Sequence, residues 1–322
     1  MHAASTRHLN RPLVTIVVVC CNQAPYVVEC LESIRQQTYD NIELIIVDDC
    51  SQDDSVSTIS EWLETTGVRA TFIEHPENRG ICRTFNEAVA RAHGSYVSIV
   101  AADDVYLPDK TEAQVAMLER LPGTVGVVYS DAWQIDQHGN LLSAKFIGSH
   151  RSFETMPEGK LFPILLEGNF IPAMATLIRR ACFETVGFYD ENLAYEDYDM
   201  WLRLARQYEF VFLPGISVKY RVVPTSATRT ILKSGGEGLR SDFRTYEKFL
   251  RARDLNSEER ARVKLRLTFV GYEMYARNFA ARRYYLAKLF QYNPRGYTLV
   301  MLLFVMAGIP FRYFSALLRR AG

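Results

Sequence analysis

The sequence predicts an α/β protein in which helices cover both faces of a mostly parallel sheet. Its first hundred residues alternate short apolar runs, rich in Val and Ile, with helical segments of ten or more residues. Consecutive parallel strands need crossovers of about this length, because the chain must return to the same end of the sheet. The apolar runs are nearly continuous, as expected of strands that are buried on both faces. Together these observations predict repeated βαβ units.

The elements of this first part follow in a regular order. Pro25 opens the first helix, a position that proline favours. The predicted strands cover residues 14–20, 42–49, 69–75 and 94–104, and the predicted helices cover residues 25–37, 54–66 and 80–92. Strand and helix therefore alternate throughout, as a parallel sheet requires.

The elements after Pro108 are more varied. We expect a helix to about residue 121, strands at 124–133 and 169–180, and closing strands at 210–215 and 217–223. Residues 196–208 read as an amphipathic helix, because apolar and aromatic residues recur there at helical spacing. Residues 141–158 are expected to be irregular, and residues 224–242 to be a flexible linker before further helices.

Composition and charge limit the protein class. Apolar residues make up 48% of the chain and charged residues 23%, which argues against a protein with many membrane spans. From Met274 to Gly322 there are eight Lys or Arg and no Asp or Glu, so the rest of a neutral chain carries a net charge of -8. The six cysteines show no metal-like spacing, which favours reduced thiols in a cytosolic protein. The sequence thus predicts an acidic body and a basic tail.

Polar side chains cluster at the predicted strand ends. Asn22 follows the first strand, Asp48 and Asp49 end the second, and Asp103 and Asp104 end the fourth. Ligands of parallel α/β sheets bind beyond the carboxyl ends of the strands. We therefore expect these five residues to line one crevice.

Three stretches carry a family resemblance: residues 14–55 with IELIIVDDCSQDDS, residues 77–110 with NRGICRTFNEA and AADDVYLPDK, and residues 187–205 with YEDYDMWLRLA. They resemble the family 2 glycosyltransferases, in the family's order and over about residues 12–225. The resemblance implies the GT-A fold, a Rossmann-like nucleotide-sugar-binding architecture, over residues 1–225. It also implies transfer of a sugar from a nucleotide donor to a hydroxyl acceptor, usually with inversion and with a divalent metal ion.

By this resemblance, Asp48 and Asp49 belong to the donor site. A pyrimidine base offers an imide N–H, which a fixed carboxylate such as Asp49, or Asp48 beside it, can accept. The alternative is that these aspartates only belong to a cap of the second helix, with Ser51 or Asp53 as its N-cap.

The resemblance also places Asn22, the loop 78–80 and Arg83 near the base or the diphosphate. Gly80 would permit close approach of the backbone at a helix start. A helix cap by Asn78 is the alternative for this loop.

Asp103 and Asp104 match the carboxyl half of the family's DxD-type motif. The resemblance makes Asp104 the ligand of Mg²⁺ or Mn²⁺ and directs Asp103 toward the ribose or the metal shell. Oxygen ligands suit both ions, and Mg²⁺ is typically held by one or two carboxylates plus substrate phosphates. The alternative is a pair of turn-forming aspartates before a helix at Pro108.

The sequence departs from the family pattern at two possible ligand positions. Ala101 stands where the motif has its first Asp, and Val223 stands where some members have a His. Metal dependence is therefore in question, and a basic side chain such as Arg221 or Lys219 is an alternative source of positive charge.

Asp197 is the candidate general base. The motif YEDYDMW matches the family's Glu-Asp pair before a helix. A close second carboxylate, here Glu196, could raise the pKa of the base toward the working pH. The alternative is that Glu196, Asp197 and Asp199 only favour the positive end of the helix dipole.

The C-terminal region reads as a membrane-association device. Residues 297–311 carry no charge and are flanked by Arg295 and Arg312, but this apolar run is short for a span. We expect residues 226–264 to form a linker and helical connection, and residues 265–322 a peripheral anchor on the cytoplasmic face of the membrane. An oligomerisation or core-packing helix pair is the alternative, and no motif supports nucleic-acid binding.

The sequence thus predicts an inverting transferase that uses a UDP- or dTDP-sugar and a glycan or lipid-linked acceptor. A rhamnosyltransferase of O-antigen, lipopolysaccharide or capsule assembly is the favoured version. A nucleotide-sugar-binding scaffold subunit without activity is the rival, favoured by Ala101 and Val223. A dinucleotide oxidoreductase is disfavoured, because no GxGxxG loop follows the first strand.

Overall fold

The computed structural model of the chain describes residues 11–223, 236–277 and 282–292. The chain divides into two compact units, Met1–Ser226 and Ala227–Gly322, and each is considered by itself. The first unit carries the sheet with its helices, and the described part of the second is helical.

The strands of the first unit are β1 (Val14–Cys20), β2 (Ile42–Asp48), β3 (Ala70–Glu74), β4 (Tyr96–Ala101), β5 (Val105–Tyr106), β6 (Val125–Ile135), β7 (Leu141–Lys145), β8 (Thr176–Arg179) and β9 (Glu209–Arg221). Within residues 11–223 they form one nine-stranded sheet in the order β3-β2-β1-β4-β8-β6-β9-β5, with β7 paired to β6. Neighbours β3, β2, β1 and β4 are parallel, and β6 is parallel to β9. Strands β8, β5 and β7 pair antiparallel to their neighbours. The predicted mostly parallel α/β sheet is confirmed.

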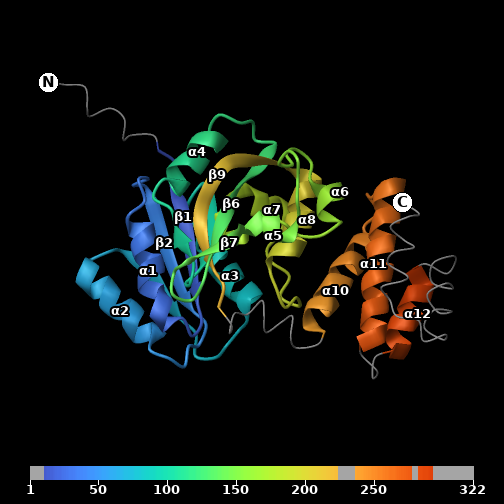
Figure 1. Cartoon of the computed structure of the whole chain (residues 1–322), viewed down its shortest axis with the longest axis horizontal. Helices are drawn as coiled ribbons and strands as arrows, with labels where there is room; N and C mark the ends of the chain where they lie inside the picture. The colour runs from blue at the N-terminus through green and yellow to red at the C-terminus, as the bar shows by residue number, and fades with distance from the viewer. Residues whose placement is uncertain (1–10, 224–235, 278–281, 293–322) are drawn as a thin grey trace. The chain divides into compact units, whose positions relative to one another are not determined.

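The helices of this unit are α1 (Ala24–Arg35), α2 (Ser55–Thr66), α3 (Ile81–Ala90), α4 (Lys110–Leu118), α5 (Phe146–His150), α6 (Phe162–Leu165), α7 (Ala181–Val186) and α8 (Asp197–Gln207). Figure 1 shows α1 and α2 packed together beside β1 and β2.

Both faces of the central strands are covered, as their apolar sequences predict. Val14, Ile16 and Val18 of β1 join a buried cluster with residues of α1, α2 and α4. Val17 and Val19 point to the opposite face, because successive side chains of a strand alternate, and they are equally buried. Helix α3 contacts β1 and β2 while contributing nothing to that cluster, so it lies on this second face.

Four sequence expectations were wrong in detail. The strand expected at 169–180 is confined to β8, Thr176–Arg179, and a short 3-10 helix, Ala173–Ala175, precedes it. Residues 141–158 were expected to be irregular, but β7 pairs with β6 across a turn at residues 136–140, and α5 follows. All five residues of β7 are exposed. Because neither face of the strand is buried, its sequence does not need to alternate polar and apolar residues, and no such pattern marks it. Asp136 closes the turn by accepting backbone N–H groups of His138 and Asn140.

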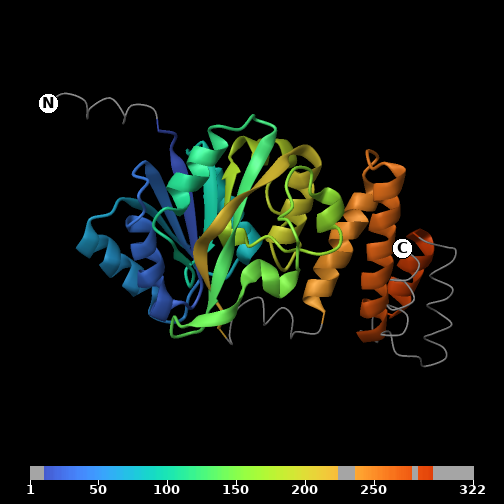
Figure 2. The same cartoon turned by 45° about the horizontal axis from the view of Figure 1, so that its top comes forward.

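The two closing strands, expected at 210–215 and 217–223, are one strand, β9, which runs beside β6 (Figure 2). Gly215 adopts a φ of +112°, and the pairing register shifts beside it, between Tyr129 and Asp131 of β6. An irregularity of this kind lets a strand continue past a Pro-Gly pair that reads as a break in the sequence.

The second unit contains α10 (Glu237–Arg251), α11 (Ser257–Arg277) and α12 (Arg282–Tyr292). The predicted linker at 224–242 was too long, since α10 begins at Glu237 and buries Phe243, Tyr246 and Phe249. No helix among the described residues is long and apolar enough to cross a membrane. The apolar segment 297–311 lies outside the described residues, so the structure leaves the predicted anchor untested.

Close packing at Gly94 gives a first prediction. A Cβ at this position would lie 2.5 Å from the backbone nitrogen of Thr15 and 2.8 Å from the carbonyl of Leu13, so backbone atoms would have to move. We expect Gly94→Ala to lower the free energy of unfolding by about 1–3 kcal/mol. Gly123→Ala is the matched control, because a Cβ there meets nothing within 4 Å. Urea denaturation of both variants measures the difference, and equal stabilities would contradict this packing.

Candidate active site

The register of the parallel strands brings the predicted strand-end residues to one edge of the sheet. Asp48 pairs opposite Cys20, and Ala101 pairs opposite Val19. The chain therefore leaves β1, β2 and β4 at nearly the same level. The loops that carry Asn22, Asp48, Asp49, Asp103 and Asp104 consequently begin side by side.

Asn22 and Asp48 tie the first two of these loops together. Asp48 accepts the backbone N–H of Ser51 at 2.8 Å and its hydroxyl at 2.6 Å. That hydroxyl oxygen also accepts the backbone N–H of Asn22 at 2.8 Å, and the Asn22 side chain accepts the backbone N–H of Gln52 at 2.7 Å. Asn22 and Cys50 adopt positive φ values of 56° and 62°. Both predicted residues thus hold the loops at the carboxyl ends of β1 and β2 together through internal hydrogen bonds.

Asp49 holds the loop before α3. Its carboxylate accepts the backbone N–H groups of Arg79 at 2.8 Å and Gly80 at 3.0 Å. The ring nitrogen Nδ1 of His75 lies 2.8 Å from the same carboxylate. The predicted loop 78–80 therefore lies at the carboxyl end of β2, and Asp49 fixes it there. The expected contact of Asp49 or Asp48 with a base remains a prediction.

His75 is a site-supporting residue that the sequence analysis does not identify. It is only 6% exposed and lies between two carboxylates. Its Nε2 lies 3.1 Å from Glu87 of α3, and Glu87 also accepts a 3.0 Å hydrogen bond from the Arg79 side chain. The closed ring of Asp49, His75, Glu87 and Arg79 joins the ends of β2 and β3 to α3. A single His in a sequence gives no signal of such partners.

Arg83 lies on α3, and its side chain is 56% exposed. Its Nε pairs with Glu191 at 3.1 Å. Asn86 of the same helix donates a hydrogen bond to the backbone oxygen of Tyr189 and accepts one from its backbone N–H. The structure thus places Arg83 where it attaches α3 to the loop that leads to α8. Its predicted contact with the donor remains a prediction.

Asp103 and Asp104 lie beside Arg221, the last residue of β9. Asp104 accepts the backbone N–H of Arg221 at 2.9 Å, and Nε of Arg221 donates to the backbone oxygen of Asp103 at 2.9 Å. The guanidinium of Arg221 also pairs with Glu29 and lies 4.7 Å from the ring centre of Tyr26. The basic side chain that the sequence suggested as an alternative to metal is thus in contact with the aspartate pair.

Burial dominates the electrostatics of this pair. Asp103 and Asp104 are 7% and 2% exposed, and burial raises the pKa of each carboxyl above the ordinary value for aspartate. For Asp104, the negative charge of Asp103 raises the pKa further, while Arg221 opposes the shift. Any cation that reaches the two carboxylates would favour their ionised forms.

The aspartate pair fits a divalent cation only if phosphate oxygens complete the site. Within the described residues, no group of three His, Cys, Asp or Glu side chains could hold a metal ion. Ala101 and Val223 add no ligand atoms. Two adjacent carboxylates are nevertheless the usual protein share of a Mg²⁺ site that is completed by substrate phosphates.

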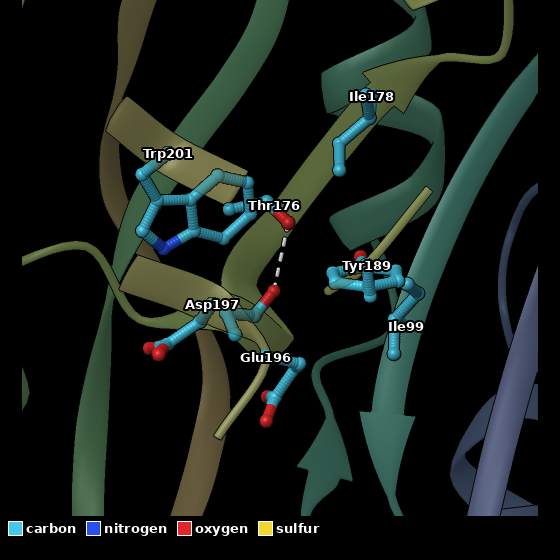
Figure 3. Close-up of a pocket in the computed structure, with 8 residues that line it drawn as sticks. Ile99, Thr176, Ile178, Tyr189, Glu196, Asp197 and Trp201 are labelled. Atoms are coloured by element: carbon cyan, nitrogen blue, oxygen red, sulfur yellow. Dashed lines mark hydrogen bonds between the residues drawn. The ribbon is translucent and has the colours of Figure 1, made fainter. Parts of the chain in front are cut away.

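Glu196 and Asp197 begin α8 and line a pocket with Ile99 of β4, as Figure 3 shows. The two carboxylates leave the helix start in different directions (Figure 3). Asp197 accepts hydrogen bonds from Asn169 Nδ2 at 2.7 Å and from the backbone N–H of Tyr198 at 2.7 Å. The candidate base thus shares a pocket with the strand that leads to Asp103 and Asp104.

The pocket raises the pKa of both carboxyls. Burial is the main cause for each, and the charge of Asp197 adds to the increase for Glu196. The hydrogen bonds from Tyr198 and Asn169 oppose the shift of Asp197 and so favour its ionised form. A raised pKa makes the Asp197 carboxylate a stronger proton acceptor than an ordinary aspartate, as a general base requires.

Two further residues belong to the surroundings of Asp197, and the sequence analysis assigns neither to the site. Asn169 orients Asp197, but it lies 28 residues upstream and no local pattern links the two. Within the described residues, the indole N–H of Trp201 is buried, lines the pocket and has no hydrogen-bond partner. A water or a substrate hydroxyl in the pocket would satisfy it.

Comparison with known proteins identifies relatives of this chain. The family described as glycosyl transferase family 2 matches residues 15–187. An uncharacterized glycosyltransferase of Rickettsia prowazekii is 31% identical over 227 residues, covering 70% of this chain and 69% of that protein. One from Rickettsia typhi is 32% identical over 222 residues, with coverages of 69% and 67%. The chondroitin synthase of Escherichia coli is 31% identical over 60% of this chain, but the match spans only 26% of that enzyme.

Solved structures show the same fold. TarS 1-349 of S. aureus, in complex with UDP-GlcNAc, superposes with a TM-score of 0.65 at 16% identity, covering 87% of this chain and 80% of that one. The mannosyltransferase PcManGT from Pyrobaculum calidifontis, in complex with GDP-Man and Mn²⁺, gives a TM-score of 0.55 at 19% identity, with coverages of 93% and 81%. At such identities the likeness concerns the fold alone, and it confirms the predicted GT-A architecture.

The ring around His75 gives a second prediction. We expect His75→Ala to lower the free energy of unfolding by about 2–4 kcal/mol, because two carboxylates lose a buried partner and a cavity remains. His93→Ala is the control, since His93 pairs with Glu43 but its side chain is 79% exposed. Its loss should cost less than about 1 kcal/mol. If urea denaturation gave equal losses for the two variants, the ring would not be a stabilising element.

Proposed function

Because the chain belongs to glycosyl transferase family 2, we propose that it transfers a sugar from a nucleotide donor to a hydroxyl acceptor with inversion of configuration. The observation that carries this proposal is that strand β4 connects two carboxylate pairs. Asp103 and Asp104 follow β4, while Glu196 and Asp197 line a pocket against Ile99 of the same strand. A donor whose diphosphate lies at the first pair could present its sugar to the second.

We assign donor binding and catalysis to residues 1–225, with Asn22, Asp48, Asp49, Arg83, Asp103 and Asp104 in the donor site. The proposed donor is a UDP- or dTDP-sugar. The UDP-GlcNAc complex of TarS supports a uridine nucleotide, whereas the GDP-Man complex of PcManGT shows that this fold also accepts guanine. Rhamnosyl transfer to a glycan or lipid-linked acceptor, in O-antigen, lipopolysaccharide or capsule assembly, is the version that we favour.

Asp197 would act as the general base. The acceptor oxygen forms a bond to the anomeric carbon while its proton passes to the Asp197 carboxylate. The bond from that carbon to the diphosphate oxygen breaks, and the nucleoside diphosphate leaves with the bonding electrons. Attack opposite to the leaving group inverts the anomeric centre. Asn169, at 2.7 Å from Asp197, would hold the carboxylate in the orientation that this step needs.

Asp104, with Asp103 beside it, would hold Mg²⁺ or Mn²⁺ together with the donor diphosphate. Such an ion neutralises charge that develops on the leaving group. Arg221 already lies against the pair and would share this role by stabilising negative charge near the diphosphate. With Ala101 and Val223 in place of two possible ligands, we propose a weaker metal requirement than a full motif would give.

The second unit would associate the enzyme with the cytoplasmic face of the membrane, through residues 265–322 and with residues 226–264 as the connection. The absence of acidic residues from Met274 onward supports this placement. Homo-oligomerisation through the same helices is the alternative role for the region.

A nucleotide-sugar-binding scaffold without transferase activity is the second candidate function. Ala101 and Val223 are the observations that favour it. Donor binding with no hydrolysis or transfer, in the presence and absence of Mn²⁺, would support the scaffold.

Asp197→Asn tests the proposed base. The substitution preserves shape and hydrogen bonding but removes the proton acceptor, so kcat should fall about 10²–10⁴-fold while the donor still binds. Asp40→Asn is the control, because Asp40 precedes β2 at the opposite edge of the sheet and should leave kcat unchanged. Turnover of Asp197→Asn equal to that of the unsubstituted chain would exclude this base.

The pH profile tests the same residue independently. Burial raises the pKa of Asp197, so its ionised, active fraction decreases as the pH falls through this raised value. The acid limb of kcat/KM should therefore lie above the ordinary aspartate value of about 3.9. An acid limb at that ordinary value would contradict a buried base.

A further inference from the structure

The second unit contains a pocket that none of the proposed chemistry uses. It encloses about 290 Å³ and is lined by Arg240, Phe243 and Arg244 of α10 and by Tyr284 and Tyr285 of α12. A volume near 300 Å³ is at the lower end for small-molecule sites and suits a headgroup-sized ligand. The pocket lies entirely within this unit.

The base of the pocket is aromatic and closely packed. Phe243 and Tyr285 are 2% and 6% exposed, and their rings meet edge to face with centroids 5.2 Å apart. Gly271 of α11 lies behind them, where a Cβ would approach Phe243 to 3.0 Å and Leu289 to 2.7 Å. Three helices thus fix the position of the two rings.

The rim of the pocket is basic. Arg240 and Arg244 are exposed and one helical turn apart on α10, so they lie on the same face of the helix. No acidic side chain is among the five residues that line the pocket. Glu247, one turn further along α10, is already paired with Lys288 and Arg251.

Tyr285 adds a neutral donor to this rim. Burial raises the pKa of its phenol, while the charge of Arg240 and a hydrogen bond to it act in the opposite direction. The hydroxyl therefore stays protonated near neutral pH. Tyr284 is 52% exposed and offers a second ring at the entrance.

Two guanidinium forks and a phenol above an aromatic base match a phosphate group that carries an uncharged organic substituent. Guanidinium groups bind phosphate oxygens in a bidentate manner, and two of them at one rim can bind the same phosphate. The rings would contact the substituent. We propose that this pocket binds the phosphate of a phosphorylated amphiphile, such as an anionic lipid headgroup or a lipid-linked phosphate.

The site extends the membrane association proposed above, but its test needs neither donor nor acceptor. Failure of the protein to transfer a sugar and failure of the pocket to bind phosphate are therefore distinguishable. The full chain is mixed with vesicles of phosphatidylcholine alone, or of phosphatidylcholine with phosphatidylglycerol, at physiological salt, and bound protein is measured by co-sedimentation. Sodium pyrophosphate serves as the soluble competitor, and its binding to the protein alone is measured by calorimetry.

A built site and a diffuse basic surface predict different results. Loss of a charge-assisted hydrogen bond should weaken binding more than about 10-fold in Arg240→Gln and in Arg244→Gln. Arg251→Gln is the matched control, because Arg251 ends the same helix, is 64% exposed and does not line the pocket. Removal of a charge from a diffuse surface should weaken binding at most about 5-fold. Arg240→Lys keeps the charge but loses the fork, so it should also weaken binding.

The outcomes separate the possible sources of the phosphate. Loss of phosphatidylglycerol binding in the two pocket variants, with competition by pyrophosphate, would support a membrane phosphate. If the two pocket variants lose pyrophosphate binding but keep phosphatidylglycerol binding, the same site binds a soluble phosphate ligand. Equal losses in Arg240→Gln and Arg251→Gln, full retention in Arg240→Lys, or no binding to either probe would overturn the proposal. Circular dichroism checks that each variant is folded.

Discussion

The parallel register of β1, β2 and β4 is the constraint on which the site depends. Asp48 lies opposite Cys20 and Ala101 opposite Val19, so three loops leave the sheet at one level. Polar groups that are far apart in the sequence therefore meet without any strand being distorted. A slip of one residue in any of the three strands would turn its side chains to the opposite face and separate the loops.

Asp48 and Asp49 bind neighbouring loop residues of the protein and thereby fix the positions of the loops. Asp48 and Asn22 join two loops through Ser51 and Gln52, and Asp49 holds the loop before α3. The pairs Asp103–Asp104 and Glu196–Asp197 differ, because burial raises the pKa of all four carboxyls. Raised pKa values at buried carboxyls destabilise the ionised protein, a cost that functional sites commonly carry.

The sequence was sufficient for the parts of the structure that depend on local pattern. Apolar runs and helix-length crossovers gave the parallel strands, and the ends of those runs gave the aspartates. Partners across the fold carried no such signal: the contacts of His75 with Asp49 and of Asn169 with Asp197 join residues that are distant in sequence. Strand β7 was missed for a different reason, since an exposed edge strand lacks the apolar alternation by which strands are recognised.

We propose that the loops at the carboxyl ends of β1, β2 and β4 bind the diphosphate of a nucleotide sugar. Calorimetric titration of the full chain with UDP-, dTDP- and GDP-sugars, with and without Mn²⁺, tests it most directly. The account predicts saturable binding of at least one donor, strengthened by Mn²⁺ and weakened about 10-fold or more in Asp103→Asn, with Asp40→Asn unchanged. Absence of binding for every donor, or equal affinity in both variants, would contradict it.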